Sequence, residues 1–217
     1  MKTGITELVF ILDKSGSMAG LEGDTIGGFN AMLKKQQDEE GEAVVTTVLF
    51  DDHYELLHDR INIKGIRPIT NKEYYVGGST ALLDAIGKTI HKIGTAQKHT
   101  SEELRADKVM FVITTDGMEN ASHEYSSTKI KQMVEHQKEK YGWEFIFLGA
   151  NIDAVETAER FGIQRDRAAT YNADGAGTML NFSVISDTVS EFRVGCGIKE
   201  DWKKSIEQDH QKRGRRR

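Results

Sequence analysis

Apolar residues in this chain fall into short continuous runs that alternate with stretches of helical spacing. The first run, Leu8 to Leu12, reads L-V-F-I-L, and a second, Lys108 to Thr115, reads K-V-M-F-V-I-T-T. Runs of this length and branching are typical of strands buried on both faces of a sheet. Each run ends at an aspartate, Asp13 in the first case and Asp116 in the second. The repetition predicts two equivalent buried strands that are each followed by a polar loop.

The same periodicities predict the other elements. Further strands are expected at 43–50, 54–57, 143–148 and 168–171, and helices over 26–40, 80–93, 130–134, 155–161 and 174–185. Ser79 or Thr80 is expected to cap the second helix and Asp174 the last. Periodicity is weak over 59–75, which predicts a loop with at most one helical turn. The charged stretch 199–210 predicts a loosely attached helix.

Alternation of strands and helices predicts an α/β fold. We expect a doubly wound, Rossmann-like, mostly parallel six-stranded sheet with helices on both faces and one short antiparallel edge strand. In such sheets, ligands bind beyond the carboxyl ends of the strands, where the winding reverses direction. If the two buried strands are neighbours at that reversal, Asp13 and Asp116 emerge side by side.

Composition supports a single soluble domain. The chain has 217 residues, of which 38% are hydrophobic and 29% charged, and no run is long enough to cross a membrane. We expect a domain over 1–195 and a charged C-terminal segment over 196–217 with a basic tip: Lys212, Arg213, Arg215, Arg216 and Arg217. No signal peptide is evident, so a cytoplasmic location is expected. The isolated chain is expected to be a monomer.

Charge and cysteine content narrow the function classes. A formal net charge of −5 argues against general nucleic-acid binding, and no membrane partner is expected. Cys196, the only cysteine, excludes an internal disulfide and is expected to be a small apolar residue of the fold. The seven histidines show no coordinating arrangement in the sequence.

The loop after the first strand carries candidate metal ligands. It reads D-K-S-G-S, which places Asp13, Ser15 and Ser17 at alternate positions, with Gly16 allowing a tight turn. Magnesium prefers oxygen ligands of this kind and commonly keeps waters beside one or two carboxylates. The pentapeptide alone is equally consistent with a loop that caps the next helix. A second glycine-rich loop ends at Thr80, and a third begins at Asp116.

The three loops together resemble the von Willebrand factor A (VWA) domain and its metal-ion-dependent adhesion site, in particular the stand-alone bacterial members. The match covers about residues 4–192 and includes all three motifs in the right order. The resemblance implies that Ser15 and Ser17 bind Mg²⁺ or Mn²⁺ directly and that Thr80 binds directly or through water. It implies that Asp13 and Asp116 hold waters of the ion. It also implies that a partner protein supplies an Asp or Glu to the metal, so the chain is expected to be a protein-binding module and not an enzyme.

Two alternatives remain open at this point. In a magnesium-dependent aspartyl phosphatase or phosphotransferase, Asp13 would be the nucleophile, but Ser15 stands where the acid/base carboxylate is normal and no lysine is clearly placed for the phosphate. The other alternative is an intracellular scaffold or adaptor of a stress response, similar to stand-alone proteins associated with tellurium resistance. In that case the contacts would lie at the charged C-terminal segment.

Overall fold

The computed structural model describes residues 4–214, which form a six-stranded sheet in the order β3-β2-β1-β4-β5-β6. The strands are β1 (Thr6–Asp13), β2 (Ala43–Phe50), β3 (Tyr54–Asn62), β4 (Lys108–Thr115), β5 (Glu144–Ala150) and β6 (Ala168–Tyr171). All neighbours pair in parallel except β2 and β3, which are antiparallel. The predicted fold class is therefore confirmed.

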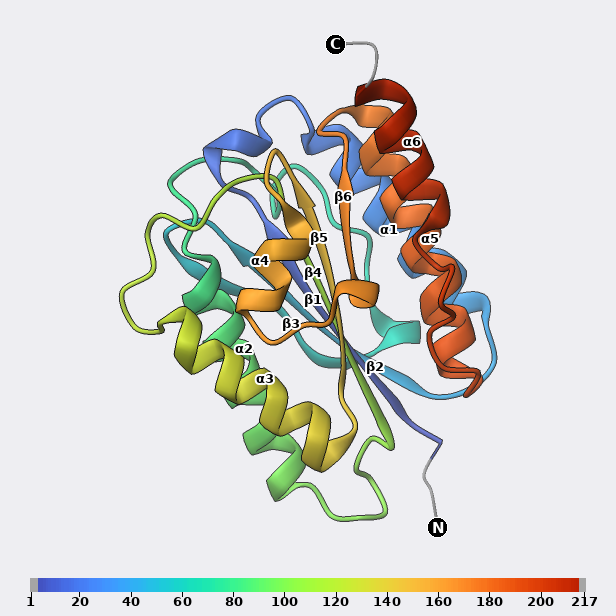
Figure 1. The fold of residues 1–217 in the computed structure, drawn as a ribbon. Coiled ribbons are helices and arrows are strands. Elements are labelled where there is room, and N and C mark those ends of the chain that lie inside the picture. Colours follow the sequence, from blue (N-terminus) through green and yellow to red (C-terminus); the bar gives the residue numbers. More distant parts are fainter. Residues whose placement is uncertain (1–3, 215–217) are drawn as a thin grey trace.

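Helices cover both faces of the sheet (Figure 1). They are α1 (Glu22–Asp38), α2 (Leu82–His99), α3 (Ser127–Tyr141), α4 (Ala154–Arg160), α5 (Gly175–Arg193) and α6 (Lys204–Gly214). Side chains of β1 alternate between the layers: Leu8, Phe10 and Leu12 pack towards α1, α5 and α6. Val9 and Ile11 pack towards α2, α3 and α4. The alternation explains why the run is apolar at every position.

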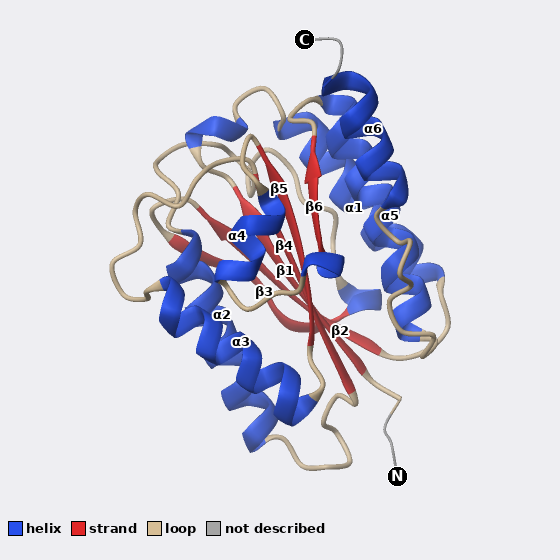
Figure 2. Ribbon diagram, viewed as in Figure 1, coloured by secondary structure: helices blue, strands red, loops and turns tan. Residues whose placement is uncertain are grey.

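Winding reverses at β1, because β2 and β3 lie on one side of it and β4 to β6 on the other. Strands β1 and β4 run in parallel register, with Leu12 opposite Thr114. Both strands therefore end at the same edge of the sheet, where the loops that follow them gather (Figure 2). This register places the two predicted aspartates at one point.

Strand β3 is longer than the sequence predicts, extending to Asn62 and not ending near residue 57. Its pairing with β2 shifts register between Val45 and Val48, which breaks the alternation on which the prediction depended. Arg60 adopts φ +50° and donates from Nε to the buried Glu7 carboxylate at 2.7 Å. A 3-10 turn, Ile63–Gly65, follows directly. Part of the predicted 59–75 loop is thus strand.

Helix α6 packs firmly, so the prediction of a loosely attached helix is wrong. Trp202 and Ile206 are buried in the core layer that contains α1 and α5. The Trp202 indole also donates to the Asp166 carbonyl at 2.7 Å. Two apolar residues in a highly charged stretch do not produce the helical periodicity that would predict a buried helix face. Arg215, Arg216 and Arg217 of the predicted basic tip lie outside the described residues.

Two smaller predictions have opposite outcomes. The Asp174 side chain caps α5 by accepting from the Gly177 amide at 2.8 Å, as predicted. Cys196 is exposed and not part of the core, because it follows the end of α5 in a turn between two glycines with positive φ, Gly195 and Gly197.

Candidate metal centre

The loop after β1 is anchored through Asp13, whose side chain is almost fully buried. Its Oδ1 accepts from the Ser15 amide at 2.7 Å, and its Oδ2 accepts from the Thr115 hydroxyl at 2.6 Å. The buried Tyr74 hydroxyl donates to the Asp13 carbonyl at 2.6 Å. Asp13 therefore ties the first loop to the end of β4 and holds the backbone turn that presents the two serines.

The serine hydroxyls lie beside the second carboxylate. Ser15 Oγ and Ser17 Oγ are 3.0 Å apart, and Ser17 donates to Asp116 Oδ1 at 2.5 Å. The other carboxylate oxygen, Asp116 Oδ2, is buried and accepts no hydrogen bond from the described residues 4–214. An unpaired buried oxygen of this kind is costly unless a cation or an ordered water meets it.

Thr80 completes the predicted set of oxygens. A Cβ at Gly117 would lie 3.1 Å from Ser17 Oγ and 3.6 Å from Thr80 Oγ1, so both hydroxyls face the same glycine. The missing side chain at Gly117 thus lets the three loops approach. The structure brings Asp13, Ser15, Ser17, Thr80 and Asp116 together at one edge of the sheet.

Thr80 does not cap α2, contrary to one prediction. The N-cap residue is Ala81, and it makes no side-chain capping bond. The backbone of Thr80 instead pairs with the loop after β4: its amide donates to Asn120 Oδ1 at 2.9 Å, and its carbonyl accepts from the Asn120 amide at 3.1 Å. This pairing fixes the position of the Thr80 hydroxyl relative to Asp116.

Two acidic side chains whose roles cannot be assigned from the sequence also stabilise these loops by accepting backbone hydrogen bonds. Glu119 accepts from the backbone amides of Leu83, Ala121 and Ser122. Asp84, in the first turn of α2, accepts from the amides of residues 123, 124 and 125, each at 2.9 Å. The only sequence signal for either role is a carboxylate beside a loop, which surface polarity explains equally well.

Lys14 points away from the candidate site. Its Nζ lies 3.1 Å from Glu55 and 3.6 Å from Asp51, both on the β2–β3 hairpin side, and 4.3 Å from the centre of the Tyr75 ring. The lysine next to the candidate nucleophile is therefore already occupied by two carboxylates.

Electrostatics at the site favour a cation. Burial raises the pKa of Asp13 above its ordinary value, although bonds from Ser15 and Thr115 lower it. Burial also raises the pKa of Asp116, and the negative charge of Asp13 adds to this effect. Two buried carboxylates without a nearby positive charge are unfavourable, and a divalent ion among hydroxyl and carboxylate oxygens would offset both. The donor set therefore fits a hard divalent metal.

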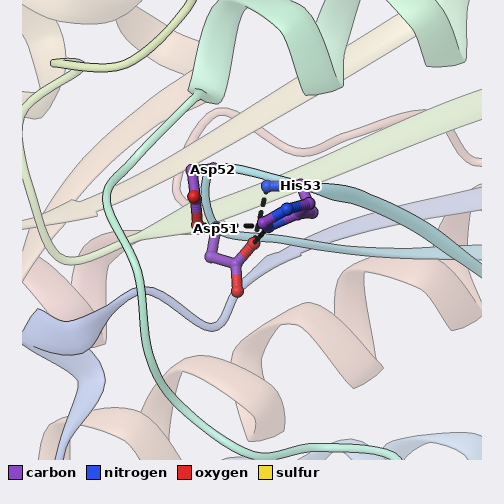
Figure 3. Close-up of side chains that lie close together, drawn as sticks. All are labelled: Asp51, Asp52 and His53. Carbon is purple, nitrogen blue, oxygen red and sulfur yellow. Dashed lines mark hydrogen bonds and ion pairs between the residues drawn. The ribbon is translucent and has the colours of Figure 1, made fainter.

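A second cluster lies on the neighbouring hairpin (Figure 3), where the potential ligand atoms of Asp51, Asp52 and His53 are all within 4.8 Å of one another. His53 Nδ1 is 3.4 Å from Asp51 Oδ1 and 3.3 Å from Asp52 Oδ1. The cluster could hold a metal ion, which corrects the expectation that no histidine is suitably placed. Asp52 and His53 are exposed, and exposed acidic groups are common without an ion.

No protein-family model and no curated protein sequence matches the chain, but solved structures share its fold. A von Willebrand factor type A structure from Catenulispora acidiphila has a TM-score of 0.56 at 13% identity, covering 85% of this chain and 42% of that chain. Proximal thread matrix protein 1 from the mussel byssus, with a zinc-occupied MIDAS motif, gives 0.58 at 12%, covering 84% and 47%. Manganese-loaded TRAP protein from Plasmodium vivax gives 0.54 at 14%, covering 84% and 74%.

These similarities establish the fold: the chain has the architecture of a VWA domain, as the sequence motifs predict. The chain spans about half the length of the mussel matrix protein. Within residues 4–214, no helix is both long and apolar enough to cross a membrane.

Proposed function

We propose that this chain is a metal-dependent protein-binding module. Asp13, Ser15, Ser17, Thr80 and Asp116 would hold Mg²⁺ or Mn²⁺, and a partner protein would supply an Asp or Glu side chain to the ion. The proposal is carried by the buried Asp116 Oδ2, which accepts no hydrogen bond within residues 4–214, although the other oxygen of the same carboxylate accepts from the Ser17 hydroxyl. The zinc-occupied and manganese-loaded structures of the same fold support a divalent ion in this chain.

The bound ion would supply a positive charge that attracts an external carboxylate. Asp13 holds the first loop in place, Ser15 and Ser17 offer hydroxyl oxygens, and Thr80 is fixed by its pairing with Asn120. The affinity would come from one desolvated charge contact together with the surrounding loop surface. The position of Lys14 gives the phosphatase alternative no phosphate-binding cation at this loop.

Capture of a partner tests this proposal. Native lysate would be passed over immobilised wild type in Mg²⁺ and in EDTA, beside Ser15→Ala and the exposed control Ser127→Ala. We expect a partner that is held in Mg²⁺ by wild type and the control but not by Ser15→Ala or in EDTA. If the same proteins bind in all lanes, the metal site is not the recognition surface and the scaffold alternative gains support.

The choice of variant follows from the contacts. The Ser15 hydroxyl bonds to the Ser17 hydroxyl and to the Asp13 carboxylate. Both partners keep other hydrogen bonds when it is removed, so the free energy of unfolding should fall only slightly. Removing the Asp13 carboxylate instead leaves the Thr115 hydroxyl and the Ser15 amide without an acceptor, which costs about 1–3 kcal/mol. Ser15→Ala therefore separates binding from folding better than Asp13→Ala.

The domain boundary near residue 195, the cytoplasmic location and the monomeric state remain predictions. An intracellular adaptor would meet its partner in a reducing compartment, which agrees with a single exposed cysteine. Light scattering of the purified chain in Mg²⁺ would test the monomeric state, and a dimer mass would contradict it.

A further inference from the structure

Two large apolar side chains are strongly exposed in the loops around the candidate metal centre. Met118 is 73% exposed and Tyr75 is 57% exposed. Single exposed apolar residues are ordinary on a protein surface. These two, however, border the loop that carries Ser15 and Ser17, and methionine and tyrosine are enriched at the centres of protein interfaces.

The two residues lie on opposite sides of that loop. Met118 comes two residues after Asp116, at the end of β4, on one side of β1 in the sheet. Tyr75 lies under Lys14, whose Nζ is turned towards the β2–β3 hairpin on the other side. The Tyr75 segment adjoins the loop directly, since the Gly77 amide donates to the Lys14 carbonyl at 2.9 Å.

Both positions are held in place before any partner binds. The Lys14 ammonium lies 4.3 Å from the centre of the Tyr75 ring and is itself fixed by Glu55. Met118 stands on a turn that is fastened by the Glu119 and Asn120 bonds to the start of α2. An apolar contact that is already positioned loses less conformational entropy on binding.

We propose that Tyr75 and Met118 are paired apolar contacts for the partner segment whose carboxylate reaches the metal. The partner segment then has an acidic residue with apolar residues on both sides of it. This inference rests on the proposed function and adds the sequence class of the partner. The carboxylate supplies the charge contact, and the two apolar side chains lose water against Tyr75 and Met118.

Random-peptide display tests the inference without knowledge of the partner. Peptides would be selected on the Mg²⁺-loaded chain, and only those released by EDTA would be sequenced. We expect an acidic residue in the released peptides, with apolar residues enriched on both sides of it. The affinity of one such peptide would then be measured by fluorescence anisotropy for wild type and variants.

Matched variants separate these contacts from general surface effects. Tyr75→Ala and Met118→Gln should each weaken the peptide by about tenfold, whereas Tyr75→Phe and Met118→Leu should bind as wild type does. Tyr141→Ala and Met179→Gln are the matched controls, because they change an exposed tyrosine and an exposed methionine outside the loops of the site. They should not change the affinity for the peptide. Circular dichroism would confirm that every variant is folded.

The outcomes distinguish the two proposals. If no peptide is released by EDTA, the proposed metal-dependent function fails, and this inference fails with it. If released peptides share an acidic residue but show no apolar enrichment, the metal-dependent function stands and the role of Tyr75 and Met118 is overturned. The same conclusion follows if Tyr75→Ala and Met118→Gln bind as tightly as wild type.

Discussion

At the residue scale, the candidate site depends on what Gly117 lacks as much as on the oxygens that surround it. Any side chain there would contact the hydroxyls of Ser17 and Thr80. The aspartates and serines could be predicted from the sequence because the motif places them directly after buried strands. Gly117 follows Asp116 in the same motif, but its close approach to another loop is visible only in three dimensions.

Gly117→Ala should weaken Mg²⁺ binding by roughly tenfold or more while the chain stays folded. The added methyl group lies 3.1 Å from Ser17 Oγ, closer than ordinary contact, so the hydroxyl must move. Calorimetric titration with Mg²⁺ measures the change. Gly27→Ala is the matched control, because its added methyl meets no atom within 4 Å and it lies within α1. Equal Mg²⁺ affinity for both variants would contradict the arrangement.

At the element scale, α2 and the loop after β4 are fastened by carboxylates that accept backbone amides. These fastenings could not be predicted, because a loop aspartate or glutamate has the same sequence pattern whether it faces water or a neighbouring backbone. The length of β3 and the firm packing of α6 also differ from the predictions, because both depend on contacts with other segments of the chain. A bulge disrupts the alternation in β3, and α6 depends on long-range contacts of Trp202 and Ile206.

Asp84→Asn should lower the free energy of unfolding by about 1–3 kcal/mol at neutral pH, because an amide cannot accept all three backbone bonds. Burial raises the pKa of Asp84, but the three backbone hydrogen bonds lower it by more. Its folded pKa therefore lies below the ordinary 3.8. The stabilisation from its charge is thus complete above the unfolded pKa and is lost as pH falls through the folded pKa.

Urea unfolding of wild type and Asp84→Asn between neutral pH and about pH 3 checks this prediction. The difference between the two proteins should be constant near neutrality and shrink only in the acid range. A difference that grows as pH falls would show that the Asp84 carboxylate is not stabilised by its backbone donors. Asp187→Asn, at an exposed carboxylate on α5, provides a control for general charge effects.

At the scale of the whole molecule, the winding reversal at β1 brings three loops that are distant in sequence to one edge of the sheet. This architecture could be predicted from the sequence, because buried strands and helices alternate clearly and the fold then dictates where their ends meet. The packing of the C-terminal segment could not be predicted from the sequence, because it depends on contacts with the rest of the folded chain. Arg213 pairs with Asp174, the cap of α5, and with Asp209 of α6.

Removal of residues 211–217 should leave Mg²⁺ affinity unchanged. The lost Arg213 pairs are partly exposed, and pairs of this kind contribute about 0–1 kcal/mol to folding. Calorimetric titration of the shortened chain measures the affinity, and thermal unfolding verifies that it is folded. A large loss of affinity in a folded protein would show that the C-terminal segment belongs to the metal site.

Calorimetric titration with Mg²⁺ and Mn²⁺ tests most directly whether the oxygens around Asp116 hold a divalent ion. Wild type would be compared with Asp116→Asn, which removes the charge with almost no change in shape, and with Asp38→Asn, which alters an exposed carboxylate. We predict that wild type and Asp38→Asn bind the ion with equal affinity, and that Asp116→Asn binds it at least about tenfold more weakly. Equal binding by all three proteins, or no binding by wild type, would contradict the account.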